Sequence, residues 1–329
     1  MQRNDVHHMI APARRRSVAR GLAAVMAAAA LIATGGCATS TTGTAPSPSA
    51  TPPSTTTALR TTAAPSIVAA ADSGVSWAPA AQAQLHPGVQ AYTGDSQCTT
   101  NFVFTDARGE VYFGQAAHCG HVGTEKLPNG CTATTVPIGT PVDLRTGGSL
   151  RTRGTTEATG TLAYDSWAAM QAAGEKDPNA CAHNDFALIR LPKNVVGAVN
   201  PSLPHWGGPV DLDVDRVSAG DRAYGYGDSS LRGGRNALSP HIGLVQATAD
   251  PGTGGWAHTV TAVRPGVPGD SGAGYVDAQG RALGTLSTLS LSVPPRNTLS
   301  DLSRELRYAQ QHSGIPGLRL VLGTEPFHS

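Results

Sequence analysis

A serine flanked by glycines, in residues 268–274, is the first segment whose residue types could do chemistry. The segment reads Pro-Gly-Asp-Ser-Gly-Ala-Gly and places Ser271 at its centre. A serine hydroxyl is a weak nucleophile unless a base takes its proton and donors hold the oxyanion that forms. Glycines let the backbone turn sharply and leave amide hydrogens free to point at one spot. The segment therefore indicates either a serine nucleophile with a main-chain oxyanion hole or a polar turn between strands.

A candidate base and a candidate acid both lie upstream of this serine. His118 follows two alanines, and Asp185 stands directly before the apolar run 186–191. A catalytic serine needs a histidine that accepts its proton and an acid that orients the imidazole. Taken singly, the histidine reads as structural and the aspartate as a strand cap. Taken together, the three residue types predict a catalytic triad of His118, Asp185 and Ser271.

The order of these residues along the chain separates the known kinds of serine hydrolase. Histidine, aspartate, serine is the chymotrypsin-type order, and the α/β-hydrolase and subtilisin types run differently. With Ala-Ala-His-Cys at 116–119, Asn-Asp-Phe-Ala-Leu at 184–188 and Gly-Asp-Ser-Gly at 269–272, the chain resembles the chymotrypsin-like serine proteases, especially secreted bacterial, actinobacterial-looking members. The resemblance covers about residues 88–315. It implies an all-β fold of two six-stranded antiparallel barrels with the site between them and a C-terminal helix.

The resemblance also implies a role for each site residue. His118 would act as general base and then general acid, while Asp185 fixes its tautomer. Ser271 would attack the acyl carbon of a polypeptide substrate, and the amides of Gly269 and Ser271 would bind the oxyanion. Each such donor is worth about 3–4 kcal/mol. Ser287 matches the family serine that donates a hydrogen bond to the triad acid.

The expected substrate pocket, at Pro265, Ser287 and Leu289, departs from the trypsin pattern. Pro265 stands where trypsin-like members carry an aspartate, so a preference for Lys or Arg is not expected. Leu289 stands where the family usually has a glycine that keeps the pocket open. The resemblance therefore predicts a narrowed apolar pocket that favours small side chains.

Asp270 matches the family aspartate that pairs with a newly formed N-terminal amine after activation. No activation sequence of the Ile-Val-Gly-Gly type is evident, and Ile67-Val68 is a poor match. We therefore expect an internal basic residue to pair with Asp270, although the sequence does not identify which one.

Residues 1–36 have the pattern of a lipoprotein-type signal peptide. Arg14, Arg15, Arg16 and Arg20 form a basic region, residues 21–33 an apolar run, and small residues stand before Cys37. The apolar run is shorter than the roughly 20 residues of a membrane span. Cys37 is expected to carry the lipid. Thr34 departs from the usual larger aliphatic residue of such a site, so a plain cleaved signal is the alternative, and Arg15-Arg16 only faintly resembles a twin-arginine signal.

The next segment, residues 37–70, is built almost entirely of Thr, Ser, Pro, Ala and Gly. Such a composition cannot bury a core and predicts a disordered tether. We expect the protease domain at 71–329. The protein would then be exported, and either anchored by lipid to the outer face of the membrane or secreted.

Charge and composition exclude some other classes of function. Residues 1–36 hold five of the 24 basic residues and one of the 23 acidic ones, which leaves the remaining chain near −3. This balance does not suggest a nucleic-acid groove. We expect no cofactor, no metal and a monomer.

The chain has five cysteines, of which Cys37 is the odd one. The other four lie in the exported part, where disulfides form, and four cysteines allow three connectivities. Metal binding is a weak alternative because there is no Cys-x-x-Cys pair. The resemblance implies a Cys98–Cys119 bridge, since the family ties the strand before its histidine to the residue just after it. That leaves Cys131 with Cys181.

Strands bounded by turns are expected to position these residues. Runs 101–105 and 110–114 predict a hairpin that leads to His118, and run 186–191 predicts a buried strand behind Asp185. Further strands are expected at 223–227, 241–245, 259–263, 274–276 and 282–287. Residues 300–312 predict an amphipathic helix capped by Ser300. The strand-like run 318–322 after it has no counterpart in the family pattern.

Two other functions fit parts of the same pattern. An inactive, protease-shaped binding module would keep the fold and lose the chemistry. An esterase of the Gly-Asp-Ser type would have the same motif around its serine. The serine of such an esterase lies near the start of an α/β chain, whereas Ser271 lies late in a β-rich one.

Overall fold

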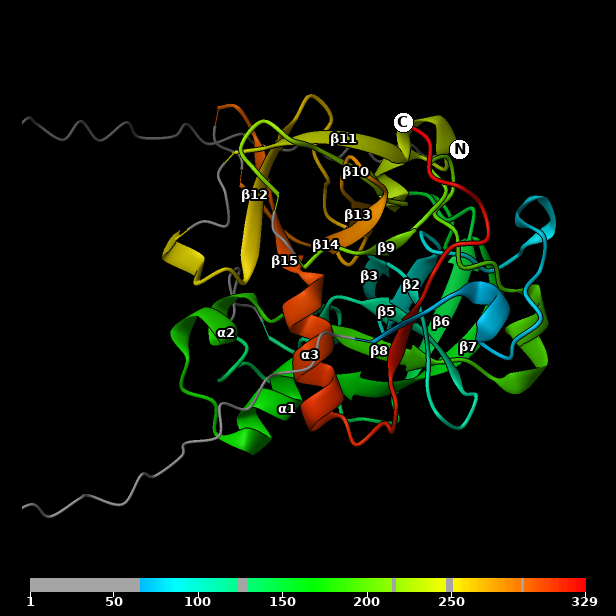
Figure 1. The fold of residues 1–329 in the computed structure, drawn as a ribbon, viewed down its shortest axis with the longest axis horizontal. Coiled ribbons are helices and arrows are strands. Elements are labelled where there is room, and N and C mark those ends of the chain that lie inside the picture. The colour runs from blue at the N-terminus through cyan, green and yellow to red at the C-terminus, as the bar shows by residue number, and fades with distance from the viewer. Residues whose placement is uncertain (1–65, 124–128, 215–216, 247–250, 291–292) are drawn as a thin grey trace, which may run out of the picture. The chain divides into compact units, whose positions relative to one another are not determined.

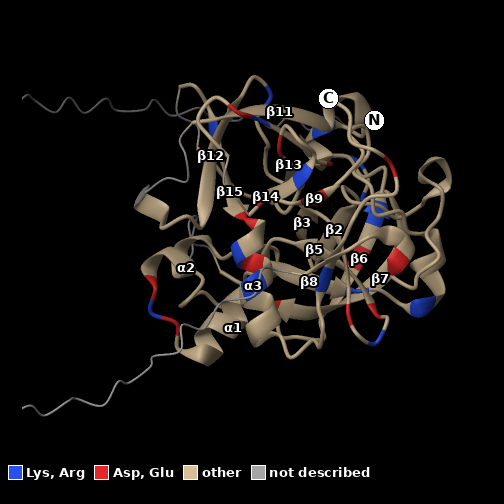
Figure 2. Cartoon of the chain, viewed as in Figure 1, with Lys and Arg blue, Asp and Glu red and all other residues tan. Residues whose placement is uncertain are grey.

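Two β-sheets make up most of the fold (Figure 1). The computed structural model describes residues 66–329 except 124–128, 215–216, 247–250 and 291–292. The expected signal peptide, Cys37 and all but the last residues of the expected tether therefore lie outside the described residues. Acidic and basic positions are interspersed over both sheets (Figure 2).

The first sheet has nine strands in the order β1-β16-β4-β5-β8-β7-β6-β2-β3. Its strands are β1 (Ile67–Val68), β2 (Gln90–Thr93), β3 (Ser96–Thr99), β4 (Val103–Thr105), β5 (Val111–Gln115), β6 (Pro141–Thr146), β7 (Thr155–Asp165), β8 (Ala187–Arg190) and β16 (Arg319–Val321). Only residues 100–102 separate β3, which pairs with β2, from β4, which pairs with β5. The amide of Asn101 donates to Gly114 O in the bend between them. The bent β3–β4 segment therefore joins the two sides and completes a six-stranded ring.

The second sheet has seven strands in the order β13-β10-β11-β12-β15-β14-β9. Its strands are β9 (Asp211–Leu212), β10 (Arg222–Tyr226), β11 (Pro240–Val245), β12 (Ala257–Ala262), β13 (Gly274–Val276), β14 (Arg281–Ser290) and β15 (Arg296–Asp301). Pairing of β13 with β14 closes six of them into an antiparallel barrel, and β9 adds in parallel to β14. The prediction of an all-β fold of two barrels is confirmed.

Each barrel is filled by side chains that alternate inward along its strands. In β11, His241 and Val245 are buried, while Ile242 and Leu244 between them are about half exposed. A separate apolar cluster contains residues of both sheets, Phe104 and Leu188 from the first and Tyr224 and Val276 from the second. This shared cluster holds the two sheets against each other.

In the part of the chain that the structure describes, three α-helices accompany the sheets: α1 (Ser166–Ala173), α2 (Pro178–His183) and α3 (Leu302–His312). Helix α3 was expected to begin with Ser300 as its cap, but the cap is Asp301, whose side chain accepts from the amide of Arg304. Ser300 instead lies buried in β15. Among the described residues, no helix has the length and apolarity needed to cross a membrane.

The run after α3 is explained by the first sheet. Strand β16 pairs antiparallel with β4, and β1 pairs parallel with β16. Val68 and Ala70, which we had assigned to the tether, are buried against this barrel. The ordered body therefore includes residues 67–70, and Ile67-Val68 is part of a sheet rather than a free activation segment.

Candidate active site

His118 lies on a short 3-10 turn, Ala117–Gly120, that directly follows β5. A disulfide joins Cys119 on this turn to Cys98 on β3. Cys98, Ala116 and Cys119 are buried together in a small cluster. The turn is therefore fixed to the sheet on both sides of the histidine, which leaves the imidazole ring as its partly exposed group.

Asp185 lies between α2 and β8 and is 3% exposed. Its Oδ2 is 2.7 Å from His118 Nδ1 and accepts from Ser287 Oγ at 2.6 Å, while its Oδ1 accepts from the His118 amide at 2.9 Å. A carboxylate only accepts, so Nδ1 carries the proton of this contact. The imidazole is thereby held in the tautomer that leaves Nε2 able to accept a proton.

The two partners shift each other's pKa. Burial alone lowers the pKa of His118, but the charge and hydrogen bond of Asp185 outweigh it and the net direction is upward. Burial alone raises the pKa of Asp185, and the charge and hydrogen bonds of His118, with that of Ser287, turn the net shift downward. Each group is thus stabilised in its charged form by the other.

Ser271 lies in the loop between β12 and β13, and this loop packs directly against the first sheet. The carbonyl of Ser271 accepts from the amide of Thr99 at 2.8 Å, and Thr99 Oγ1 donates to Gly269 O at 2.8 Å. A Cβ on Gly272, whose φ is +88°, would lie 2.5 Å from Thr99 O and 2.8 Å from Ala116 N. Gly272 is therefore required for the serine loop to approach the residues beside His118.

Two amides in the serine loop are available for an oxyanion. The amides of Asp270, Gly272 and Ala273 donate to main-chain carbonyls. Within the described residues, the amides of Gly269 and Ser271 have no such acceptor, and Gly269 has a φ of +95°. These are the two donors that the sequence pattern singled out.

Arg232 is the internal basic residue that the sequence left unidentified. Its guanidinium donates to both carboxylate oxygens of Asp270, and the two side chains are 8% and 0% exposed. The amides of Ser229 and Val267 also donate to Asp270, each at 2.9 Å. Asp270, directly before Ser271, is thus held by four donors without any free N-terminal amine.

His241 lies against this ion pair and stays neutral. Its Nε2 accepts from Arg232 at 2.8 Å, and its Nδ1 is 2.9 Å from the hydroxyl oxygen of Tyr275. Burial lowers the pKa of His241 to about 4, with Asp270 opposing the shift and Arg232 adding to it. A neutral imidazole therefore completes the packing around the pair without adding a charge.

The triad residues line one cleft of about 740 Å³. One wall comes from residues 118–185 and the other from residues 266–298. The lining residues are His118, His121, Asn129, Trp167, Ala182, His183, Asp185, Gly266, Val267, Pro268, Ser271, Leu286, Ser287, Thr288, Leu289, Asn297 and Thr298. The three residues picked from distant motifs are therefore brought to one site.

The expected pocket residues lie at different places. Ser287 and Leu289 line the cleft, whereas Pro265 is not among its lining residues, and its carbonyl accepts from Arg232 at 3.3 Å. Asn297, which we had not singled out, is 2% exposed and accepts from the amide of Gly266 while donating to the carbonyls of Gly266 and Thr288. Asn297 therefore ties two walls of the pocket together.

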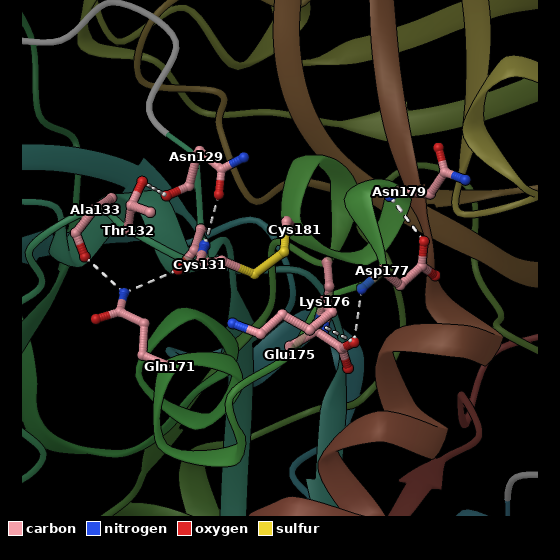
Figure 3. The surroundings of a disulfide bond; sticks show 12 residues. Asn129, Cys131, Thr132, Ala133, Gln171, Glu175, Lys176, Asp177, Asn179 and Cys181 are labelled. Atoms are coloured by element: carbon pink, nitrogen blue, oxygen red, sulfur yellow. Dashed lines mark hydrogen bonds between the residues drawn. A yellow bond between two sulfur atoms is a disulfide. The ribbon is translucent and has the colours of Figure 1, made fainter.

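A second disulfide joins Cys131 to Cys181 (Figure 3), next in sequence to Ala182, which lines the cleft. It joins the loop after Asn129 to helix α2, which leads to Asp185. Gln171 of α1 donates to the carbonyls of Gly130 and Ala133 in the same loop. Both bridges have the pairing that the resemblance implied.

Two buried acids beside the triad were not found from the sequence. Asp165 at the end of β7 caps α1 through Oδ1, and burial, followed by the charge of Asp185, raises its pKa to about 7. Glu305 on α3 is fully buried and accepts from the amide of Asp185 at 3.2 Å. Asp165 could have been noticed as an N-cap before a Ser-Trp-Ala-Ala run, but no local signal marks Glu305.

The ligand atoms of Cys98, His118 and Cys119 lie within 4.8 Å of one another, which is close enough for a metal site. Both sulfurs, however, are joined to each other in the disulfide. Zinc and similar ions bind thiolates, so this group does not fit a metal ion.

Comparison with known proteins gives only distant likenesses. No family model and no curated protein matches the chain. Among solved structures, protease A of Thermobifida fusca is 16% identical, with 73% of this chain and 99% of that one covered at a TM-score of 0.44. Nocardiopsis protease is 16% identical, covering 72% and 98% at 0.42, and the chymotrypsin of Cellulomonas bogoriensis is 19% identical, covering 72% and 97% at 0.40.

Proposed function

We propose that the chain is a serine endopeptidase that cleaves polypeptides through an acyl-enzyme intermediate. The observation that carries the proposal is the hydrogen bond from His118 to buried Asp185 in a cleft that Ser271 also lines. The two amides without an acceptor, at Gly269 and Ser271, support it further. Base, orienting acid, nucleophile and oxyanion donors are the four parts that acyl transfer needs.

The reaction proceeds in two halves. Ser271 Oγ attacks the carbonyl carbon and its proton passes to His118 Nε2, while the two amides stabilise the oxyanion. The C–N bond then breaks, and His118 gives that proton to the leaving amine. Water attacks the resulting ester, gives a proton to His118, and Ser271 recovers its proton as the acid product leaves.

The pocket accepts an uncharged side chain at the residue before the cleaved bond. Its titratable lining groups are His118, His121, His183 and Asp185, and they all lie on the wall formed by residues 118–185. The walls on the other side are Gly266 to Pro268, Leu286 to Leu289, Asn297 and Thr298, none of which carries a charge. A burial of Lys or Arg there would leave its charge without a partner. Uncharged side chains are therefore preferred, and the side chain of Leu289 on this wall favours small ones.

Labelling with a fluorophosphonate tests the proposal. The folded protein should be labelled and should digest casein, and Ser271→Ala should do neither. Ser290→Ala, which removes an exposed serine elsewhere on β14, is the matched control and should behave as the wild type. A folded wild type that resists labelling would instead indicate a binding module, and labelling without casein digestion would indicate an esterase.

A peptide panel that varies the residue before the cleaved bond tests the pocket. We expect the highest kcat/KM for small uncharged residues, and Leu289→Gly should widen acceptance towards larger ones. Preferred cleavage after Lys or Arg would contradict this assignment.

The export signal, the lipid on Cys37 and the tether belong to the same proposal, since an anchored protease would act at the outer face of the membrane. Mass spectrometry of the mature N-terminus tests them. A diacylglyceryl-modified Cys37 is expected, and an unmodified N-terminus at another residue would rule out the anchor.

A further inference from the structure

Glu305 is a buried carboxyl group placed directly behind the triad acid. It lies in the first turn of α3, where Figure 2 shows both acidic and basic positions, and its side chain is fully buried. Residues 185 and 305 are 120 positions apart, yet Glu305 Oε1 accepts from the amide of Asp185 at 3.2 Å. The helix is thus bonded to the main chain at the residue that orients His118.

The other oxygen of Glu305 is bonded to the strand that carries Ser287. Thr285 Oγ1 on β14 donates to Glu305 Oε2 at 2.9 Å, and Asn101 Nδ2 approaches Thr285 Oγ1 at 3.4 Å. Ser287, two residues further along β14, donates to Asp185 Oδ2 at 2.6 Å. One carboxyl group therefore links both segments that determine where the Asp185 carboxylate lies.

An acid is an unusual choice for this place, because a second charge beside Asp185 would be repelled. The groups that face Glu305 are Asp185, Asp301 at the cap of α3, Thr285 of β14 and Tyr164 of β7. Burial first, and then the charge of Asp185, raise the pKa of Glu305 well above its usual range. Two adjacent buried carboxyl groups do not both ionise, so Glu305 is the neutral one and Asp185 keeps its charge for His118.

We propose that Glu305 is a positioning residue for the triad: its carboxyl group holds the main chain at Asp185 and the strand bearing Ser287 in one fixed relation. It touches neither substrate nor His118 and acts through Asp185. The inference rests on the proposed function. It predicts that a neutral side chain of the same shape can replace Glu305, whereas one without the acceptor oxygens cannot.

The decisive comparison is between Glu305→Gln and Glu305→Leu. Gln keeps an acceptor oxygen for the Asp185 amide, so kcat should stay within about threefold of the wild type. The fall of kcat/KM at low pH, which reports the protonation of His118, should occur at the same pH in both proteins. Leu keeps much of the volume but no acceptor, so kcat should fall about tenfold to a hundredfold with KM unchanged, because small displacements of a catalytic group have effects of that size. Gln310→Ala, which removes a bond at the other end of α3, is the matched control and should not change kcat.

Three outcomes would overturn the inference. A Leu variant with the wild-type kcat would show that the bond is dispensable. A Gln variant as slow as the Leu variant would show that shape and acceptor are insufficient. An acid limb displaced to lower pH in Glu305→Gln would show that an ionised Glu305 had been raising the pKa of His118. If Glu305→Leu does not fold, Glu305→Asp replaces it in the comparison, since its carboxyl group is one methylene short of the Asp185 amide.

Proton NMR of the His118 Nδ1–H separates this inference from the proposed function. The resonance and its titration report the contact with Asp185 whether or not the protein hydrolyses anything. They should be unchanged in Glu305→Gln and displaced in Glu305→Leu. A wild type without hydrolase activity would remove the proposed function, and an unchanged resonance in Glu305→Leu would remove the positioning role.

Discussion

Asp185, which lines the cleft, and Asp270, directly before Ser271, are both buried aspartates, but their charges are balanced in different ways. Asp270 is paired with the guanidinium of Arg232, which stays charged at every relevant pH. Asp185 is paired with His118, whose charge can change, and its other neighbours are Ser287 and the acid Glu305. The pairing of Asp270 with Arg232 suits a loop that stays in one position. The pairing of Asp185 with His118 suits an acid whose partner gains and loses a proton.

The surroundings of the two aspartates follow from this difference. Beside Asp270, His241 is kept neutral, and Arg232 is the cation that pairs with the carboxylate. Beside Asp185, the raised pKa keeps Glu305 neutral, whereas Asp165, whose pKa is about 7, ionises in part near neutral pH. In each place one further titratable group, His241 beside Asp270 and Glu305 beside Asp185, is held neutral next to the pair.

The largest expected effect on catalysis is at the His118–Asp185 pair, whose histidine gains and loses a proton. Asp185→Asn keeps the shape but presents an amide to His118 Nδ1 and stabilises the wrong tautomer. We expect kcat to fall about 10⁴-fold, the size seen for this change in related triads, with little loss of stability. Single-turnover hydrolysis measures the catalytic rate, and urea unfolding measures the stability. A large loss of stability with a modest loss of kcat would show that Asp185, like Asp270, mainly stabilises the fold.

Breaking the Arg232–Asp270 pair should mainly lower the stability of the fold. Arg232→Met leaves the Asp270 charge buried without a cation, which costs about 3–5 kcal/mol of unfolding free energy. Urea denaturation measures the loss. Arg153→Met, which breaks the exposed pair with Asp95, is the control and should leave the unfolding free energy nearly unchanged. Equal effects of the two variants would show that the buried pair has no special role.

Asp165 should make stability depend on pH. Because its pKa is raised from 3.8 to about 7 on folding, the folded state binds this proton more tightly. The stabilisation is complete below about pH 4 and is lost as the pH rises to about 7. Asp165→Asn keeps a good cap and removes the charge, so its advantage over the wild type should grow across that range to roughly 2–4 kcal/mol. Urea unfolding at several pH values measures the difference. An unfolding free energy that changes with pH in the same way in the wild type and in Asp165→Asn would contradict this assignment.

The smallest expected effect is at Ser287. Ser287→Ala removes one of the hydrogen bonds to Asp185 Oδ2 and leaves those from His118 in place. We expect about a tenfold lower kcat, which corresponds to a hydrogen bond to a charged group of about 1.5 kcal/mol. Steady-state kinetics measure it, and a loss as large as that of Asp185→Asn would show that Ser287 does more than support the acid.

Local patterns were sufficient for some elements and misleading for others. The alternation in 241–245 and the apolar run 186–191 correspond to β11 and β8, because burial on one or both faces sets the sequence period. The cap of α3 was placed one residue early, because Ser300 and Asp301 are both good caps and only the end of β15 decides between them. The short strands β2 and β3 were missed because four residues carry too weak a period.

The sequence by itself determined the triad candidates and the serine loop, because a nucleophile between glycines, a histidine before a cysteine and an acid before a buried strand are each written in adjacent residues. Only the tertiary structure decided which group pairs with Asp270 and what lies behind Asp185. Arg232 and Glu305 are 38 and 120 residues from their partners. Partner choice at such separations depends on which side chains share a buried volume, and that volume exists only once the two barrels have closed and packed together.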